Sequence, residues 1–239
     1  ILEPSETWLK DNKDRLEYVS LPCYSKEFRN RDNIKGGGVK AYIRDNIKYK
    51  RRKDIENTQP DMEHLWLEIQ GKNKHSKLLL GNFYRSEAMH RPSVWLDKFE
   101  DLISYITTQW DGLLVLTGDM NFDLLGIADA PTRRYMSLLD TLNVKQVIDK
   151  LQEQKEHHEL IINDLSKITS HGVIPCSIVS DHDGPFACVN IRVARYQPRY
   201  KYIRNLKNLS ETAFLDDDPD DQLETLNTLK GTHPSEGAV

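Results

Sequence analysis

Three runs in the first half of the chain predict β-strands, and in the first of them apolar and polar residues alternate with a period of two. The first run covers residues 38–44 and follows directly on three glycines, which predicts a tight turn leading into a strand. The second and third runs cover residues 64–70 and 77–84, with a polar Gly-Lys-Asn-Lys loop between them. Two strands joined by so short a loop are expected to form an antiparallel, hairpin-like pair.

Apolar residues at spacings of three and four predict one long helix over residues 93–110. Ser93 is a candidate for its N-cap, because a serine hydroxyl can accept a hydrogen bond from a free backbone N–H. The apolar stripe of this helix consists of Leu96, Phe99, Leu102, Ile103 and Ile106.

A continuous apolar run at residues 113–116 predicts a fully buried strand, which ends at Gly118 and Asp119. A second helix is expected over residues 132–142, and short strands near residues 144–148, 160–162, 173–179 and 185–193. Many strands and few helices, with several antiparallel pairs, indicate two packed sheets flanked by helices, which is an α/β sandwich.

Charge is distributed unevenly along the chain, and this suggests two parts. The 239 residues include 33 Lys and Arg against 37 Asp and Glu, which gives a net charge of −4. Residues 40–53 carry seven basic residues and one acid, whereas residues 211–224 carry seven acids and no base. We interpret residues 1–195 as the folded domain and residues 196–239 as a partly disordered appendage. Lys50, Arg51 and Arg52 in the basic run are candidates for contacts to phosphate.

The composition also limits the compartment in which the chain works. No apolar run approaches the roughly 18 residues of a membrane span. The three cysteines are widely spaced without a Cys-x-x-Cys pair, which favours a reducing compartment. The first residues lack the basic region of a signal peptide. We therefore expect an intracellular protein, nuclear or cytoplasmic, that does not bind a membrane.

Candidate chemistry follows the buried strand at residues 113–116. Asp119 and Asn121 are two residues apart, so their side chains point the same way if the chain stays extended. A carboxylate beside a carboxamide can orient a water molecule and donate a hydrogen bond to a phosphate oxygen. The alternative interpretation is a polar turn after a strand, in which the two side chains bind only their own backbone.

Three other short motifs carry polar groups near predicted strands. Asp181 and His182 follow an apolar segment, and such a histidine can stabilise negative charge, ligate a metal, or belong to an ordinary polar loop. Tyr84 and Arg85 end a strand and offer a phenol and a guanidinium to phosphate. Glu6 precedes an apolar Trp-Leu pair, and a helix-capping turn is an equally good interpretation there.

Taken in order, these motifs form a recognisable series. Glu-Thr-Trp, Gly-Gly-Gly-Val-x-Ala-Tyr-Ile-Arg, Leu-Trp-Leu-Glu-Ile, Tyr-Arg, Gly-Asp-x-Asn and Ser-Asp-His follow one another along the chain. The series resembles the endonuclease/exonuclease/phosphatase superfamily, and most closely the endonuclease domain of non-LTR (LINE-type) retrotransposon polyproteins. The resemblance covers residues 1–195 and implies a four-layer α/β sandwich like that of deoxyribonuclease I, with a first strand that this chain lacks. Residues 199–204 and the acidic segment after them resemble the linker toward a reverse transcriptase.

The resemblance implies a role for each polar residue in the first part of the series. Glu6 would be a ligand of a divalent cation, Mg²⁺ or Mn²⁺, because such ions prefer hard oxygen donors. Tyr84 would donate a hydrogen bond to the scissile phosphate, with Arg85 beside it. Asp119 would orient or deprotonate the attacking water, and Asn121 would hold the phosphate.

The last motif completes the implied site. His182 would stabilise the pentacoordinate phosphorus, Asp181 would bind metal or adjust the charge beside it, and Ser180 would assist at the phosphate. The implied reaction is in-line hydrolysis of a DNA phosphodiester by a monomeric domain, with the divalent cation neutralising charge on the phosphate.

Three departures from the family pattern leave other functions open. The family's first strand carries an asparagine at the metal site, and this chain begins after that strand. A Pro-Thr-Arg segment of the family has no match after residue 148. Glu159 stands where the family has the aspartate that orients the histidine, and a glutamate adds a methylene. The alternatives are therefore a catalytically decayed remnant and a phosphatase of the same superfamily.

Overall fold

The computed structural model describes seven segments of the chain: residues 1–9, 19–31, 36–72, 76–124, 128–148, 159–176 and 183–193. All of these residues belong to one compact unit, Ile1–Gln197. The expected appendage at 196–239 and the Ser180-Asp181-His182 motif therefore lie outside the described residues.

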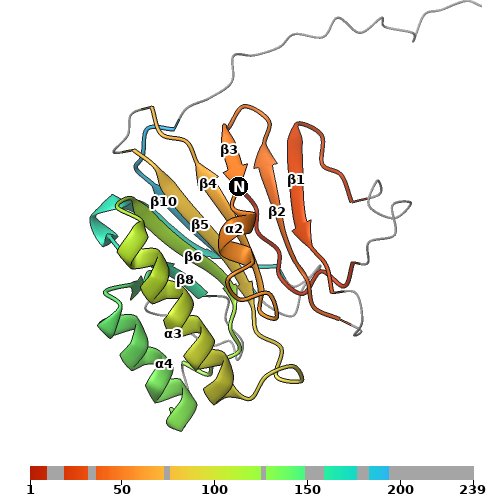
Figure 1. Cartoon of the computed structure of the whole chain (residues 1–239). Helices are drawn as coiled ribbons and strands as arrows, with labels where there is room; N and C mark the ends of the chain where they lie inside the picture. Colours follow the sequence, from red (N-terminus) through yellow and green to blue (C-terminus); the bar gives the residue numbers. More distant parts are fainter. Residues whose placement is uncertain are drawn as a thin grey trace, which may run out of the picture. The chain divides into compact units, whose positions relative to one another are not determined.

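A mixed six-stranded sheet is the centre of this unit (Figure 1). Its strands, in spatial order, are β3 (Tyr49–Arg51), β4 (Glu63–Ile69), β5 (Leu78–Tyr84), β6 (Leu113–Asp119), β8 (Glu159–Ile162) and β7 (Lys145–Gln146). The pairing of β4 with β5 is antiparallel, which confirms the predicted hairpin-like pair. Only β5 and β6 pair in parallel among these strands.

Two helices cover one face of this sheet, as Figure 1 shows. They are α3 (Pro92–Gln109), which connects the parallel strands β5 and β6, and α4 (Ala130–Thr141).

The prediction that Ser93 caps the first of them is wrong: Arg91 holds the cap position, and proline starts the helix, where its missing N–H costs nothing. On α4 the cap is Asp129, whose side chain accepts the N–H of Thr132 at 2.8 Å. A single turn, α2 (Lys53–Glu56), lies between β3 and β4.

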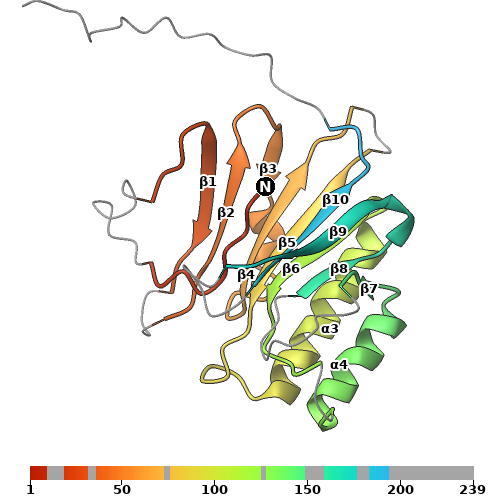
Figure 2. The same ribbon diagram turned by 180° about the vertical axis from the view of Figure 1, so that it is seen from behind.

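Two small antiparallel sheets lie on the other side of the central sheet (Figure 2). One pairs β1 (Tyr24–Arg29) with β2 (Val39–Arg44), and the other pairs β9 (Ile168–Ile174) with β10 (Gly184–Val189). The first residues of the chain are extended and run beside β2, with bridges from Leu2 to Tyr42 and from Ser5 to Val39. A short 3₁₀ turn, Leu165–Lys167, precedes β9. The sequence pattern missed β1 and β3 and placed β9 five residues too late.

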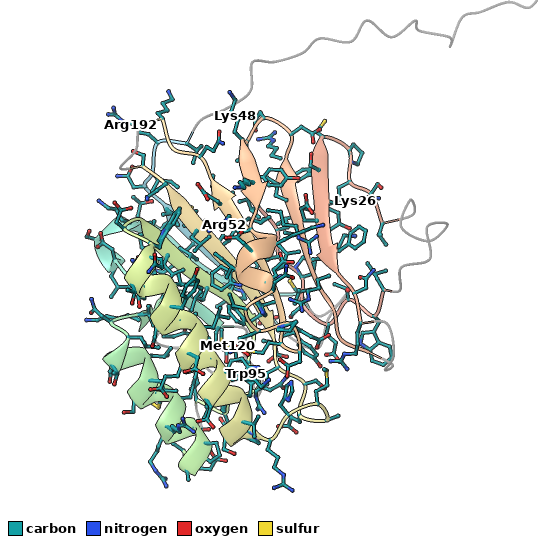
Figure 3. All side chains as sticks on the ribbon, viewed as in Figure 1. Lys26, Lys48, Arg52, Trp95, Met120 and Arg192 are labelled. Carbon is teal, nitrogen blue, oxygen red and sulfur yellow. The ribbon has the colours of Figure 1, made fainter. Side chains whose placement is uncertain are left out.

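Alternation along the central strands divides their side chains between two cores. On β5, Leu79 and Phe83 pack toward the helices, whereas Leu80 and Tyr84 face the small sheets. Trp95 of α3 and Met120, which follows β6, belong to the core on the helix side and are labelled in Figure 3. Because the central strands are buried on both faces, they read as nearly continuous apolar runs.

The α/β sandwich predicted from the pattern is confirmed, with one difference in the number of layers. In the part of the chain that the structure describes there are three: the helices, the central sheet and the small sheets. No long helix covers the outer face of the small sheets among these residues. None of the described helices has the length and apolar character needed to cross a membrane.

A buried histidine lies within the core on the helix side. His64 on β4 is fully buried, and the ring stacks on Phe83 with centroids 5.6 Å apart. Its Nδ1 accepts the indole N–H of Trp66 at 2.6 Å, and its Nε2 lies 3.0 Å from the carbonyl oxygen of Gln59. These partners require the neutral ring with the proton on Nε2, and burial lowers the pKa of His64 to about 4.

Acidification is expected to destabilise the fold through His64. The unfolded imidazole binds a proton near its ordinary pKa of 6.5 and the folded one does not, so stability falls as the pH drops from 6.5 toward 4. At pH 4.5 the loss is on the order of 2 kcal/mol. Urea unfolding at pH 7 and pH 4.5 measures it, with His64→Gln as the non-titrating comparison. An equal pH dependence in both proteins would contradict the prediction.

Candidate active site

The ends of three neighbouring strands bring the first candidate residues together. The parallel register of β5 and β6 places Tyr84 directly opposite Asp119. On the other side of β5, the antiparallel register places Tyr84 opposite Glu63, the first residue of β4. Tyr84 and Asp119 are 8% and 4% exposed, so a carboxylate and a phenol share one nearly enclosed edge of the sheet.

Glu6 reaches this edge from the extended segment at the start of the chain. The hydroxyl group of Tyr84 donates a hydrogen bond to its carboxylate. Burial raises the pKa of Tyr84, and the Glu6 hydrogen bond and the negative charge of Asp119 raise it further. The phenol therefore remains protonated at neutral pH and can act as a hydrogen-bond donor. The helix-capping interpretation of Glu6 is wrong, since no helix follows in residues 6–9.

The three consecutive glycines hold the Glu6 segment in place. Gly36, Gly37 and Gly38 all have positive φ angles of 74° to 90°, which residues with a Cβ rarely adopt. The carbonyls of the last two accept backbone hydrogen bonds from the opposite segment, from Thr7 N–H at 3.2 Å and from Trp8 N–H at 2.9 Å. The predicted tight turn before β2 therefore also anchors the candidate metal ligand.

Arg31 and Glu63 form an enclosed ion pair beside Tyr84, and no pattern in the sequence pointed to either residue. The Nε atom of Arg31 donates to Glu63 Oε1 at 2.9 Å, and its Nη2 bonds the other carboxylate oxygen. The two side chains are only 9% and 11% exposed. The guanidinium carbon lies 6.0 Å from the centre of the Tyr84 ring. Only the tertiary structure relates these positions, which are 32 residues apart in the chain.

Asp119 and Asn121 occupy a tight turn instead of an extended segment. Gly118 has a φ of +125°, and a Cβ there would lie 1.9 Å from the carbonyl oxygen of Phe83. Asn121 has a φ of +54°, and its backbone N–H donates to Asp119 Oδ1 at 2.9 Å. The expectation that the two side chains point the same way along a strand is therefore wrong, and the polar-turn interpretation describes the backbone.

Arg85, directly after the neighbouring strand β5, holds this turn by hydrogen bonds. Its backbone N–H donates to Asp119 O at 2.8 Å, and its guanidinium donates to the carbonyls of Met120 and Asn121. In return, Asn121 Nδ2 donates to Arg85 O at 2.7 Å. The guanidinium is almost fully buried over the ring of Phe122. Arg85 therefore shapes the turn, and its contact with phosphate stays a prediction.

Comparison with known proteins agrees with this architecture. No protein-family model and no curated protein matches the sequence. The endonuclease domain of TRAS1, a telomere-specific non-LTR retrotransposon, superposes with a TM-score of 0.55 at 11% identity, over 72% of this chain and 82% of that one. The AP endonuclease LMAP from Leishmania major gives 0.60 at 11% identity, over 82% and 78%. The 3′ phosphatase NExo from Neisseria, bound to product DNA, gives 0.55 at 12% identity, over 79% and 88%.

The chain has the endonuclease/exonuclease/phosphatase fold. The resemblance inferred from the ordered motifs is confirmed at this level. At identities of 11–12% the similarity establishes the fold and not the reaction. The roles of the individual residues therefore depend on the geometry of this chain.

The carboxylate of Glu159 binds the turn that follows β6. Its Oε2 accepts the N–H of Met120 at 2.9 Å, while its Oε1 has no partner among the described residues. Burial raises the pKa of Glu159 well above its ordinary value. His182 lies outside the described residues, as do Asp181 and Ser180, so their implied roles and the orienting role of Glu159 stay predictions.

Three of the seven basic residues at 40–53 make structural contacts. Arg51 pairs with Glu27 and Glu56, and Arg52 pairs with Asp54 and Glu68. Lys40 is 2% exposed and donates to the carbonyl of Val19 and the hydroxyl of Tyr42. Carboxylates and other oxygens already bind these three cations, and the phosphate contacts of Arg51 and Arg52 stay predictions.

Lys50 is exposed but lies far along the sheet from the candidate site. It pairs in register with Glu68, five residues from Glu63, and this separation corresponds to about 17 Å along a strand. Figure 3 shows its neighbour Lys48 with Arg192 at the end of the molecule opposite Met120. A phosphate contact at Lys50 stays a prediction and would involve DNA well away from Tyr84.

A cavity of about 1120 Å³ separates the central sheet from the strands opposite it. Apolar side chains such as Leu80, Val115 and Phe186 line it, and Glu6 and Asp119 lie among the residues around it. The candidate site therefore borders an apolar interior. Asp119 is 4% exposed beside this interior, whereas Glu6 is exposed to solvent.

Glu3 places another carboxyl group in this interior. Its Oε2 accepts the hydroxyl of Thr117 at 3.0 Å, while its buried Oε1 has no partner among the described residues. Burial raises the pKa of Glu3 to about 7. The ionised form is therefore unfavourable in the folded protein at neutral pH.

The oxygen donors at the site suit Mg²⁺, although the described residues do not enclose a metal. No group of three His, Cys, Asp or Glu side chains in the described ranges is arranged to hold an ion. Mg²⁺ commonly takes one or two protein carboxylates and leaves its other positions to water and substrate phosphate. Glu6 is exposed and offers such a carboxylate beside Tyr84, so the donor chemistry fits.

Removing the Arg85 side chain is expected to loosen the turn. Arg85→Met would leave the buried Met120 carbonyl and the part-buried Asn121 carbonyl without their donors, which costs about 2–4 kcal/mol. Chemical unfolding measures the change. Arg133→Met is the matched control, because Arg133 also donates to a carbonyl, that of Ala128, but in an exposed turn. Equal losses of unfolding free energy in the two variants would contradict the role of Arg85 in holding the turn.

Neutralising Glu3 is expected to stabilise the protein in alkaline solution. The folded pKa of about 7 lies above the ordinary value of 4.5, so Glu3 costs stability as the pH rises from 4.5 through 7. Glu3→Gln should gain on the order of 3 kcal/mol at pH 8. Most of the gain should disappear at pH 5, as thermal and urea unfolding would show. A gain that is independent of pH would indicate another cause.

Proposed function

We propose that this chain hydrolyses phosphodiester bonds of DNA with the help of Mg²⁺ or Mn²⁺. The observation that carries the proposal is the convergence of Glu6, Tyr84 and Asp119 at one edge of the central sheet. These residues come from three separate segments, and a purely structural role does not require a carboxylate, a phenol and a second carboxylate together. We further propose that residues 1–195 carry this activity and that residues 196–239 form a linker.

Each residue of the proposed site has a defined task in this reaction. Tyr84 donates its hydroxyl proton in a hydrogen bond to a non-bridging phosphate oxygen, because its raised pKa keeps it protonated. Asp119 orients the attacking water and accepts its proton while the new P–O bond forms in line with the bond that breaks. Asn121 holds the phosphate through its carboxamide, and His182 stabilises the charge on phosphorus.

Glu6 is the proposed protein ligand for the divalent cation, together with Asp181. When bound, such an ion supplies positive charge to the phosphate oxygens and polarises them. Glu6 also positions Tyr84 by accepting its hydroxyl hydrogen bond in the absence of substrate.

The similarity to DNA-processing proteins supports DNA as the substrate class. TRAS1 is a retrotransposon endonuclease, LMAP an AP endonuclease, and NExo a 3′ phosphatase bound to product DNA. Nicking of a target site, as in the TRAS1 class, is the specific form that we propose. Glu159 favours a weakened version of this activity, because its carboxylate binds Met120 N–H.

Plasmid nicking tests the proposal. The full chain with Mg²⁺ should convert supercoiled DNA to the open circle, and Asp119→Asn should slow the conversion by about 100-fold or more. Asp97→Asn is the control, since Asp97 lies on α3 and pairs with Arg134 on the protein surface. A parallel assay with a phosphoinositide and a 3′-phosphorylated oligonucleotide identifies a phosphatase.

The outcomes separate the three interpretations. Nicking that depends on Asp119 supports the endonuclease. Phosphate release from a monoester without nicking would replace it with a phosphatase. No turnover of any substrate, together with no Mg²⁺ binding in calorimetry, would establish a decayed remnant.

A further inference from the structure

The ion pair between Arg31 and Glu63 engages only part of the guanidinium. Nε and Nη2 bind the two carboxylate oxygens of Glu63, whereas Nη1 is not part of the pair. Glu63 also accepts the backbone N–H of Gly38 at 3.0 Å, which fixes the carboxylate from a second direction. The guanidinium is thus held rigidly beside the Tyr84 ring, with one nitrogen outside the ion pair.

The glycine loop provides the space for this arrangement. A Cβ on Gly37 would lie 2.5 Å from the guanidinium carbon of Arg31, which is far inside contact distance. Gly37 also has a φ of +74°. The backbone therefore approaches the guanidinium more closely than any other residue would permit, on the side of the loop that binds the Glu6 segment.

The charges at the site require a cation for any anionic substrate. Glu6, Glu63 and Asp119 bring three carboxylates to the neighbourhood of Tyr84, and a phosphodiester adds a further negative charge. Among these groups Arg31 supplies positive charge close enough to act on the Tyr84 hydroxyl. Lys50 is too far along the sheet to do so, and the Arg85 guanidinium binds the turn.

We propose that Arg31 and the glycine loop form a phosphate-binding subsite, in which Arg31 Nη1 donates to the phosphate that Tyr84 also contacts. The proposal deepens the proposed nuclease function and rests on it. Glu63 acts as a positioning residue that holds the guanidinium, and Gly37 gives it room. Arg31 is a substrate contact, because a planar guanidinium with a fixed orientation suits phosphate oxygens.

Binding of a short labelled DNA duplex, measured by fluorescence anisotropy without divalent metal at several salt concentrations, tests the subsite. Arg31→Gln should weaken binding by roughly 10-fold and reduce the slope of log Kd against log salt by about one, as expected for one lost phosphate contact. Arg31→Lys should keep most of the slope. Arg134→Gln, on the exposed surface of α4, should change neither quantity.

Glu63→Gln separates a substrate contact from a structural ion pair. It breaks the pair as Arg31→Gln does, but it leaves the positive charge at the site. If the pair were only structural, both variants would lower the melting temperature and affect binding equally. In the proposed subsite, Glu63→Gln lowers stability and keeps the salt slope. Because this variant retains the arginine, it also serves if Arg31→Gln does not fold.

The combined results distinguish failure of the subsite from failure of the nuclease. If the wild type binds and nicks DNA and Arg31→Gln keeps the full salt slope, the subsite is overturned and the nuclease stands. If Arg31→Gln loses the slope but the wild type does not nick, the subsite stands and the nuclease fails. If the wild type neither binds nor nicks DNA, both are overturned.

Discussion

The candidate site depends on the parallel pairing of β5 with β6. This register alone sets Tyr84 opposite Asp119, and it requires α3 to carry the chain from one end of the sheet back to the other. A shift of one residue would turn every side chain of β6 to the opposite face and exchange the two cores. The apolar burial that fixes the register, with Phe83 on one face and Leu80 on the other, therefore also fixes the distance between the phenol and the carboxylate.

Around this pairing, the polar groups are held by backbone contacts more than by one another. The turn after β6 is held by Arg85 through three carbonyl oxygens, and the Glu6 segment is held by the carbonyls of Gly37 and Gly38. Hydrogen bonds of this kind are directional, and every residue has the backbone carbonyl oxygen that accepts them. They place the side chains of Glu6 and Asp119 at the edge of the sheet, where Asp119 is buried and Glu6 is exposed.

Much of the fold could be predicted because its strands and helices are long enough to show their periods. The strands β4 and β5 and the helix α3 were found within two residues of their ends. The strands β1 and β3 were missed. All six residues of β1 are half-buried and β3 has only three residues, so neither shows a clear alternation of apolar and polar positions. The cap of α3 was misassigned because the helix already begins at Pro92, which places Ser93 inside its first turn.

The sequence by itself determined the long central strands β4, β5 and β6, the burial of β6 on both faces and the order of the polar motifs, since these follow from local periodicity and residue type. It could not show which charged side chains form ion pairs within the fold and which are available to a substrate. Arg51 and Arg52 read as free cations, yet carboxylates from other segments bind them. No pattern in the sequence singled out Arg31, yet Glu63 and the Gly37 turn fix it at the site. Only the tertiary structure settles such roles, because ion pairing depends on distances across the fold.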